Sequence, residues 1–225
     1  MHRGFFIAGT DTGIGKTTIS LLLLELLQQR GFTTAALKPI ASGAMQTEQG
    51  LRNQDALQLQ RATTVNLDYN QVNPFVFAPP ISPNFASLKA NCELTAERIL
   101  EACQPVLNTN VDVVVVEGIG GWEVPINQTE TMADVAKQFN FPVILVVGLR
   151  LGCLNHSLLT SHAICKSGLP MAGWVINCID NDMLCTEENI NYLKSKIDAP
   201  LLGVVPFFDD VAHAIKSQFS VINLI

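Results

Sequence analysis

Three residues near the start of the chain, Gly15, Lys16 and Thr17, have the types and the order that bind a polyphosphate. They close the stretch GTDTGIGKT at residues 9–17, between an apolar run and a leucine-rich helical segment. In a phosphate-binding loop, backbone N–H groups surround the phosphates, the lysine reaches the terminal oxygens and the hydroxyl binds magnesium. The generic pattern GxxxxGK[ST] begins with glycine where this chain has Thr10, so the loop is a variant. The alternative is a glycine-rich turn with an incidental lysine; the helix that starts here argues against it.

Carboxylates are the second requirement of such a site, because bound magnesium takes oxygen ligands. Glu117 ends the buried run VDVVVVEG, where open α/β sheets place their ligands, although it could instead cap the following turn. Asp55, in a short helical stretch, is a second candidate, and a solvated helix position would explain it equally well. Lys38, just before Pro39 at the end of another apolar run, could reach the same crevice or lie on the surface.

Short apolar runs alternate with helical segments along the chain, and these elements must position the candidate residues. Continuous Val, Ile and Leu runs, rather than alternating ones, predict parallel strands that helices cover on both faces. The expected strands are 3–9, 33–39, 111–118, 141–148, 170–177 and 199–206; the expected helices are 16–30, 52–63, 95–103, 155–166 and 187–196. Residues 72–86, with four prolines, are expected to form a long rigid connection. We predict one α/β domain over residues 1–225, with a mostly parallel, doubly wound sheet of the P-loop NTPase type.

The composition of the 225-residue chain limits the classes of partner. Its net charge is −6, and its 14 lysines and arginines form no cluster that would follow a nucleic-acid backbone. Six cysteines without a CxxC pair and four scattered histidines favour free thiols in a reducing cytoplasm over a zinc site. The apolar run before Asp11 is too short for a signal peptide, and the leucine run at 21–27 is too short to span a bilayer. These features predict a cytoplasmic protein that binds neither nucleic acid nor membranes.

Four segments together resemble the dethiobiotin synthetase family, the ATP-dependent enzymes of biotin synthesis. They are GTDTGIGKT at 9–17, LKPIASG at 37–43, VVEGIGGW at 115–122 and VVGLRLGCLNHSLLT at 146–160. The stretches GLRNQDALQLQ, VNPFVF, AGWVIN and APLLGVVP also resemble the family in order and spacing, so the resemblance covers nearly the whole chain. Unrelated P-loop proteins share only the first segment.

The resemblance implies a ligase that joins carbon dioxide to 7,8-diaminononanoate. One amine forms a carbamate, the γ-phosphate of ATP converts it to a mixed carbamic-phosphoric anhydride, and the second amine closes the ring with loss of phosphate. By position, Lys16 would hold the β- and γ-phosphates, and Lys38 would neutralise the carbamate and the transferring phosphoryl group. Thr12 would lie against the diamine. The implied magnesium ligands are Thr17, Asp55 and Glu117.

Further contacts follow from the same resemblance. It implies that ATP touches Gly13, Ile14, Gly15, Thr18, Gly118, Ile119 and Gly120, that Asn177 reads the adenine edge, and that Pro206, Phe207 and Phe208 line the adenine pocket. The implied substrate contacts are Thr12, Ser42, Gly121, Leu151, Gly152, Cys153 and Asn155. Residues 152–155 would bind the substrate carboxylate through a helix N-terminus. In the family this helix end belongs to the neighbouring subunit, so a homodimer with shared active sites is implied.

Three positions depart from the family pattern. Gly13 stands where the family can have an acidic residue, and Cys178 stands where an acid often follows the adenine-binding asparagine. Asn189 occupies the expected place of a tyrosine that touches the substrate carboxylate, while Tyr192 lies about one turn later. We expect Cys153 to be a small residue of a helix cap rather than a nucleophile.

Two other classes of protein share part of this pattern. Partitioning-type ATPase switches use a related loop but carry a lysine two residues before its second glycine, where this chain has Asp11. The segment VAHAIKSQFSVINLI at 211–225 has a single lysine and would make a poor membrane-surface helix. The synthetase half of cobyrinate-type amidotransferases needs a glutaminase domain of comparable size, which we do not expect within 225 residues.

Overall fold

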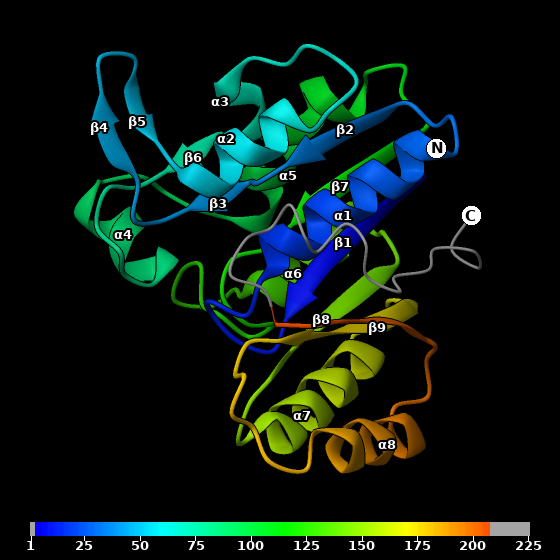
Figure 1. Ribbon diagram of the computed structural model, residues 1–225. Coiled ribbons are helices and arrows are strands. Elements are labelled where there is room, and N and C mark those ends of the chain that lie inside the picture. The colour runs from blue at the N-terminus through cyan, green and yellow to red at the C-terminus, as the bar shows by residue number, and fades with distance from the viewer. Residues whose placement is uncertain (1–2, 208–225) are drawn as a thin grey trace.

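A central sheet of six parallel strands organises the computed structural model, which describes residues 3–207 (Figure 1). The strands are β1 (Arg3–Gly9), β2 (Thr34–Leu37), β7 (Val113–Glu117), β8 (Val143–Leu149), β9 (Met171–Cys178) and β10 (Leu201–Val205). Their order across the sheet is β10-β9-β8-β1-β7-β2, and every neighbouring pair is parallel. The predicted α/β class and parallel sheet are confirmed.

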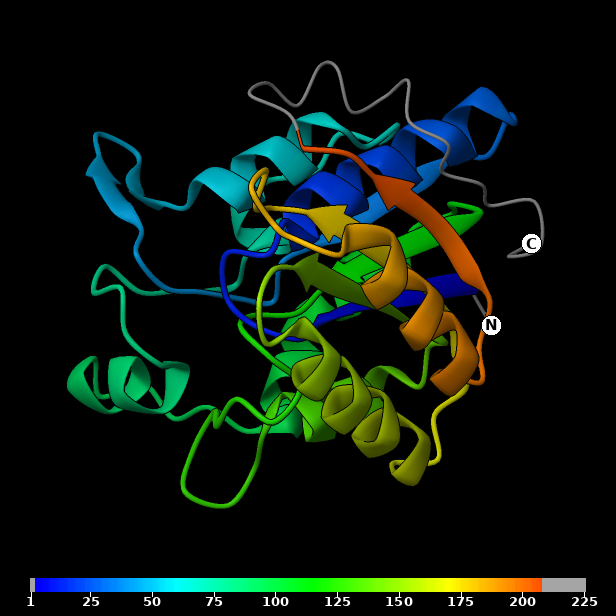
Figure 2. The same ribbon diagram turned by 60° about the horizontal axis from the view of Figure 1, so that its bottom comes forward.

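Helices cover both faces of this sheet, as the turned view shows (Figure 2). The helices α1 (Lys16–Gln29) and α2 (Gln54–Arg61) contribute to one buried apolar cluster. On the opposite face, a second cluster includes side chains of α3 (Tyr69–Val72), α5 (Ala96–Leu107), α6 (Met132–Phe139), α7 (Cys153–Lys166) and α8 (Thr186–Lys196). None of the helices described here combines the length and the apolarity that a membrane span requires.

The expected rigid connection at 72–86 is only partly correct. Within it, β6 (Phe75–Val76) pairs in parallel with β3 (Ile40–Ala41), and α4 (Pro83–Lys89) begins near its end. Proline is well tolerated in the first turn of a helix, where its missing N–H would have no intrahelical partner, so Pro83 starts α4 instead of preventing it. The sequence reading also missed α6 and the antiparallel hairpin of β4 (Met45–Thr47) and β5 (Gly50–Arg52), which projects from the side of the molecule (Figure 1).

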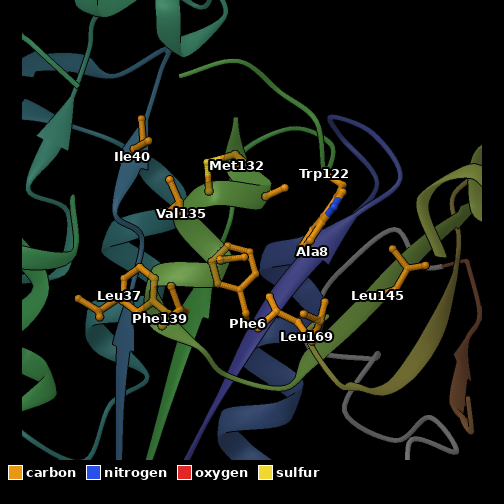
Figure 3. Close-up of a cluster of buried hydrophobic side chains, with 14 of the residues drawn as sticks. Phe6, Ala8, Leu37, Ile40, Trp122, Met132, Val135, Phe139, Leu145 and Leu169 are labelled. Atoms are coloured by element: carbon orange, nitrogen blue, oxygen red, sulfur yellow. The ribbon is translucent and has the colours of Figure 1, made fainter. Parts of the chain in front are cut away.

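The core explains why the strand sequences show no alternation of apolar and polar residues. In β1, Phe6 and Ala8 belong to the cluster on the α6 side, while Phe5 and Ile7 belong to the cluster on the α1 side. Figure 3 shows the first of these clusters, where the Phe6 ring lies near Phe139 of α6. Burying apolar side chains on both faces stabilises the sheet.

The connections that follow β1 and its two neighbouring strands leave the same edge of the sheet toward opposite faces. β1 lies between β7 and β8, and it is followed by α1 on one face. The helices that follow β7 and β8, which are α6 and α7, lie on the opposite face. The loops therefore diverge at the ends of these strands, which is the position where open α/β sheets bind ligands.

Candidate active site

The loop between β1 and α1 is held in place by a side chain from β9. Asn177 Nδ2 donates a hydrogen bond to the Ile14 carbonyl, with an N···O distance of 2.9 Å. Gly15 is the N-cap of α1 with φ of 86°, and a Cβ built there would lie 2.1 Å from Asn177 Nδ2. Only glycine satisfies both the left-handed backbone and this close approach. The loop backbone is thus fixed before any ligand arrives.

Lys16 begins α1, and its ammonium lies within the loop. Its Nζ donates to the carbonyls of Asp11 and Gly120, each at 2.7 Å. Burial, together with the nearby ammonium of Lys38, lowers the pKa of Lys16 to about 8, and the carboxylate of Glu117 partly offsets this shift. Because burial and Lys38 disfavour the charged form of Lys16, a bound anion would stabilise that form. The loop is therefore suited to bind phosphate.

Glu117 brings the loop and the neighbouring strand β7 together. It is the last residue of β7, pairs in register with Ile7 of β1, and is 1% exposed. Its Oε1 accepts hydrogen bonds from Thr17 Oγ1 at 2.8 Å and from Lys38 Nζ at 2.5 Å, while its Oε2 has no partner. A buried carboxylate oxygen without a partner is costly, which indicates that a cation or donor belongs there.

Lys38 connects this carboxylate to a second one. It follows β2 directly, is 4% exposed, and also donates to the Gly118 carbonyl at 3.2 Å. On the other side, its Nζ lies 3.7 Å from Asp55 Oδ2 in the first turn of α2. Residues from β2, α2 and β7 therefore converge on the loop, as parallel strands that end at one edge allow.

These groups line a cavity of about 650 Å³. The sequence-predicted residues on its wall are Thr12, Gly13, Gly15, Lys16, Thr17, Thr18, Lys38, Ser42, Asp55, Glu117, Ile119 and Gly120. The Ser42 hydroxyl is buried without a hydrogen-bond partner, so it is free to bind a ligand in this cavity. The cavity is large enough for a nucleotide triphosphate tail together with a small substrate.

The oxygen atoms at the cavity suit a magnesium ion that also binds nucleotide. Mg²⁺ usually takes one or two carboxylates and completes its shell with water and phosphate oxygens. Thr17, Glu117 and Asp55 offer a hydroxyl and two carboxylates, and Glu117 Oε2 still lacks a partner. Among residues 3–207, no group of three or more His, Cys, Asp and Glu side chains could hold a metal alone. The donor set fits an ion shared with phosphates, and not a closed protein cage.

An ion pair ties the loop to the chain segment that follows β8. Arg150 Nη2 donates to Asp11 Oδ2, and Asp11 Oδ1 accepts from the Thr12 N–H. Asp11 occupies the position where partitioning-type switches carry a lysine. An acid already bound to Arg150 cannot take the role of that lysine, so the geometry here argues against a switch.

Comparisons with known proteins extend this geometry. A family model described as an AAA domain matches residues 3–214. The ATP-dependent dethiobiotin synthetase BioD of Cellvibrio japonicus is 50% identical over 204 residues, covering 91% of this chain and 89% of that protein. The corresponding enzyme of Pseudomonas aeruginosa strain UCBPP-PA14 is 48% identical over 93% of this chain and 92% of its own. The enzyme of Aeromonas salmonicida is 42% identical, with 95% of each chain covered.

The chain belongs to the dethiobiotin synthetase family. The likeness to solved structures is more distant and concerns the fold alone. The septum site-determining protein MinD of Pyrococcus horikoshii, solved with Mg-ADP, matches with a TM-score of 0.57 at 17% identity, over 98% of this chain and 87% of that one. A ParA family ATPase from Chlorobium tepidum matches at 0.55 and 14% identity, over 100% of this chain and 93% of that one. They confirm the P-loop NTPase-type fold.

Several residues that the family resemblance predicts to contact ATP or substrate do not line the cavity. Within the loop, the Ile14 side chain is buried. The Gly118 carbonyl accepts a hydrogen bond from Lys38, and Gly121 lies against the Thr10 carbonyl. Asn177 touches the loop rather than open space. The adenine-side residues Pro206 and Phe207 are exposed beyond β10, and Phe208 lies outside the described residues. The cavity wall therefore contains most of the residues predicted for the phosphates and two of those predicted for the substrate, Thr12 and Ser42.

The segment before and within α7 also stays away from this cavity. Leu151 is 92% exposed, Gly152 caps the helix with φ of 93°, and Asn155 is exposed. Cys153 is buried, and burial raises the pKa of its thiol. A thiol that resists ionisation makes a poor nucleophile, which agrees with its expected place in a helix cap.

Sequence reasoning missed several residues that shape the site. Ala41, Asn53, Gln58, Pro80, Ile81, Ser82, Pro83 and Val124 also line the cavity. The prolines at 72–86 could have predicted a rigid part of the cavity wall, because proline restricts the backbone φ angle. Arg150 gave no such signal, since its partner Asp11 is 139 positions away.

Proposed function

We propose that this chain makes dethiobiotin from 7,8-diaminononanoate, carbon dioxide and ATP, releasing ADP and phosphate. The observation that carries the proposal is the convergence of Lys16, Thr17, Lys38 and Glu117 on one cavity. Its support from relatives is the identity of 42–50% to named dethiobiotin synthetases over most of the chain. Activity, ligase class and ATP dependence all follow from this membership.

ATP binds with its phosphates in the loop between β1 and α1. The N-terminus of α1 supplies backbone N–H groups and a partial positive charge, and Lys16 binds the β- and γ-phosphate oxygens. Lys16 leaves the carbonyls of Asp11 and Gly120 when the phosphates arrive, because a charged acceptor forms the stronger hydrogen bond. On the adenine side, Asn177 would bind the base and Pro206 and Phe207 would line its pocket, while the expected contact of Phe208 lies outside the described residues.

Thr17, Asp55 and Glu117 would hold a magnesium ion beside the nucleotide phosphates. The support is the pair of carboxylates with the Thr17 hydroxyl 2.8 Å from Glu117, and the oxygen of Glu117 that has no other partner. When bound, the ion neutralises phosphate charge during transfer. Lys38 Nζ lies close to both carboxylates, so its charge is beside the place proposed for the transferring phosphoryl group.

The reaction itself needs positioning and charge neutralisation more than covalent help from the protein. One substrate amine attacks carbon dioxide to give a carbamate, whose oxygen attacks the γ-phosphorus as the bond to ADP breaks. The second amine then attacks the carbonyl carbon, phosphate leaves and the ring closes. Lys38 neutralises the carbamate and the transferring group, while Thr12 and Ser42 bind the diamine end of the substrate.

The carboxylate end of the substrate lies against residues 151–155 of a second copy of this chain. The support is that Leu151, Gly152 and Asn155 are exposed and do not line the cavity of their own chain. Backbone N–H groups at the start of α7 bind the carboxylate. We therefore propose a homodimer with shared active sites, located in the cytoplasm.

Labelled bicarbonate tests the proposal directly. The protein, incubated with ATP, Mg²⁺, diamine and ¹³C-bicarbonate, should yield a cyclic urea whose carbonyl carbon carries the label. Omission of ATP should abolish the product. A labelled product other than the urea, or an unlabelled urea, would overturn the proposed chemistry.

A further inference from the structure

A buried chain of hydrogen bonds begins at Asn53, on the cavity wall, and runs to Lys38 at the end of β2. It joins Asn53, Tyr69 and Asn73, whose residues are at most 9% exposed. The Tyr69 hydroxyl accepts from the Asn53 backbone N–H at 2.7 Å and donates to Asn73 Oδ1 at 2.8 Å. Asn73 Nδ2 then donates to the Lys38 carbonyl at 2.6 Å.

The two ends of this chain are the backbones that carry Lys38 and Asp55. Lys38 has left the ladder of β2, and its own N–H donates to the Val72 carbonyl at 2.8 Å. Both backbone polar groups of Lys38 are therefore held by residues 72–73. Asn53 is the N-cap of α2, and its Oδ1 accepts from the Ala56 N–H, which fixes the first turn where Asp55 lies.

The network connects three separate elements, α2, α3 and the end of β2. α2, α3 and β2 lie side by side (Figure 1). Tyr69 is the first residue of α3, and Arg52 stacks on its ring, with the guanidinium carbon 4.2 Å from the ring centroid. The Tyr69 hydroxyl is thus placed to link α2 and the end of β2 through one atom.

We propose that Tyr69 and Asn73 are positioning residues for the reaction, setting where Lys38 and Asp55 stand relative to Glu117. This inference rests on the proposed function of those two residues in phosphoryl transfer and magnesium binding. The network is buried, so water cannot replace a lost bond at Asn53 N–H or Asn73 Oδ1. Loss of the hydroxyl lets α2 and the end of β2 shift independently, and small displacements in such a site are costly.

Tyr69→Phe tests the inference, because it removes the hydroxyl and keeps the ring under Arg52. The matched control is Thr64→Val at the opposite end of β2, where Thr64 Oγ1 accepts from the buried Thr34 N–H at 2.7 Å. Both variants remove a hydroxyl that accepts from a backbone N–H, but Thr64 is exposed and water can replace it there, so the thermal unfolding midpoint should fall less in Thr64→Val than in Tyr69→Phe. The measurements are dethiobiotin turnover against Mg²⁺ concentration, and binding of a non-hydrolysable ATP analogue at the same Mg²⁺ concentrations.

Tyr69→Phe should lower kcat about tenfold and raise the Mg²⁺ concentration for half-maximal turnover several-fold. Thr64→Val should change neither quantity. A purely structural role would reduce the fraction of active enzyme without moving the Mg²⁺ requirement, so equal Mg²⁺ curves for both variants overturn the inference. Should the wild type make no dethiobiotin, the proposed function fails, and the Mg²⁺ dependence of analogue binding alone decides on the network.

Discussion

Lys16 and Lys38 share one small volume, and their mutual repulsion has functional consequences. Lys38 is stabilised by Glu117 at 2.5 Å, whereas Lys16 bonds only to neutral carbonyls. Of these two lysines, Lys16 is the one whose ammonium has no hydrogen bond to a carboxylate. A polyphosphate would supply the negative charge that Lys16 lacks.

The lowered pKa of Lys16 predicts a pH dependence of ATP binding. With a pKa of about 8, Lys16 is charged below that pH in the free protein and neutral above it. Bound phosphates favour the charged form, so affinity should fall as pH rises through 8, by about tenfold between pH 8 and 9.5. Calorimetry at pH 9 in two buffers of different ionisation enthalpy should detect proton uptake on binding. Equal affinity from pH 7 to 9.5 would show that Lys16 does not titrate in this way.

Lys38→Gln should remove most turnover while keeping the fold. We expect a loss of about 10²- to 10³-fold in kcat, because the charge that stabilises the transferring group is absent. The glutamine amide can still donate to Glu117, whereas Lys38→Ala would leave that buried carboxylate with the Thr17 hydroxyl alone and destabilise the protein as well. The matched control is Lys137→Gln, which loses only an exposed pair with Asp134 and should keep wild-type rates. Wild-type turnover in Lys38→Gln would remove Lys38 from the mechanism.

At the scale of elements, the ends of α1 offer a comparison of two glycines. Gly15 and Gly31 have φ of 86° and 87°, but a Cβ at Gly15 meets Asn177 whereas one at Gly31 meets nothing within 4 Å. Both changes to alanine strain the backbone by about 1–2 kcal/mol. Gly15→Ala should in addition raise the KM for ATP at least tenfold, while Gly31→Ala should leave it unchanged. A similar KM in both variants would show that the contact with Asn177 does not shape the loop.

Long elements were predictable from sequence, and short ones were not. The valine run at 113–117 has to be a buried strand, and the turn before Lys16 has to start a helix, because local pattern decides both. The hairpin β4–β5 is local, but its strands of three residues each are too short to show a periodic pattern. The short β3–β6 pair depends on contacts between residues 35 positions apart, such as Ile40 and Phe75. For the same reason the residue types of Lys38, Asp55 and Glu117 suggested a site, but not the Tyr69–Asn73 network that reaches Lys38.

The whole molecule is proposed to act as a homodimer, and hybrid dimers test this. A subunit with Lys38→Gln and a subunit with Asn155→Pro, which removes a backbone N–H from the first turn of α7, are co-expressed with different tags and should each be inactive in their own homodimers. In a dimer with shared sites, the hybrid has one site with both changes and one with neither, so about half of wild-type activity returns. A hybrid as inactive as its parents would place every site within one chain.

That residues 1–225 form one domain stays a prediction.

The most direct test of the ligase account is whether phosphate release depends on the diamine. With ATP, Mg²⁺ and bicarbonate alone, the protein should release almost no phosphate, because the γ-phosphate has no carbamate to accept it. Addition of 7,8-diaminononanoate should start release, with one dethiobiotin formed for each phosphate. Steady hydrolysis that ignores the diamine would contradict the ligase account and point to an ATPase switch, to be tested next with DNA and lipid as activators.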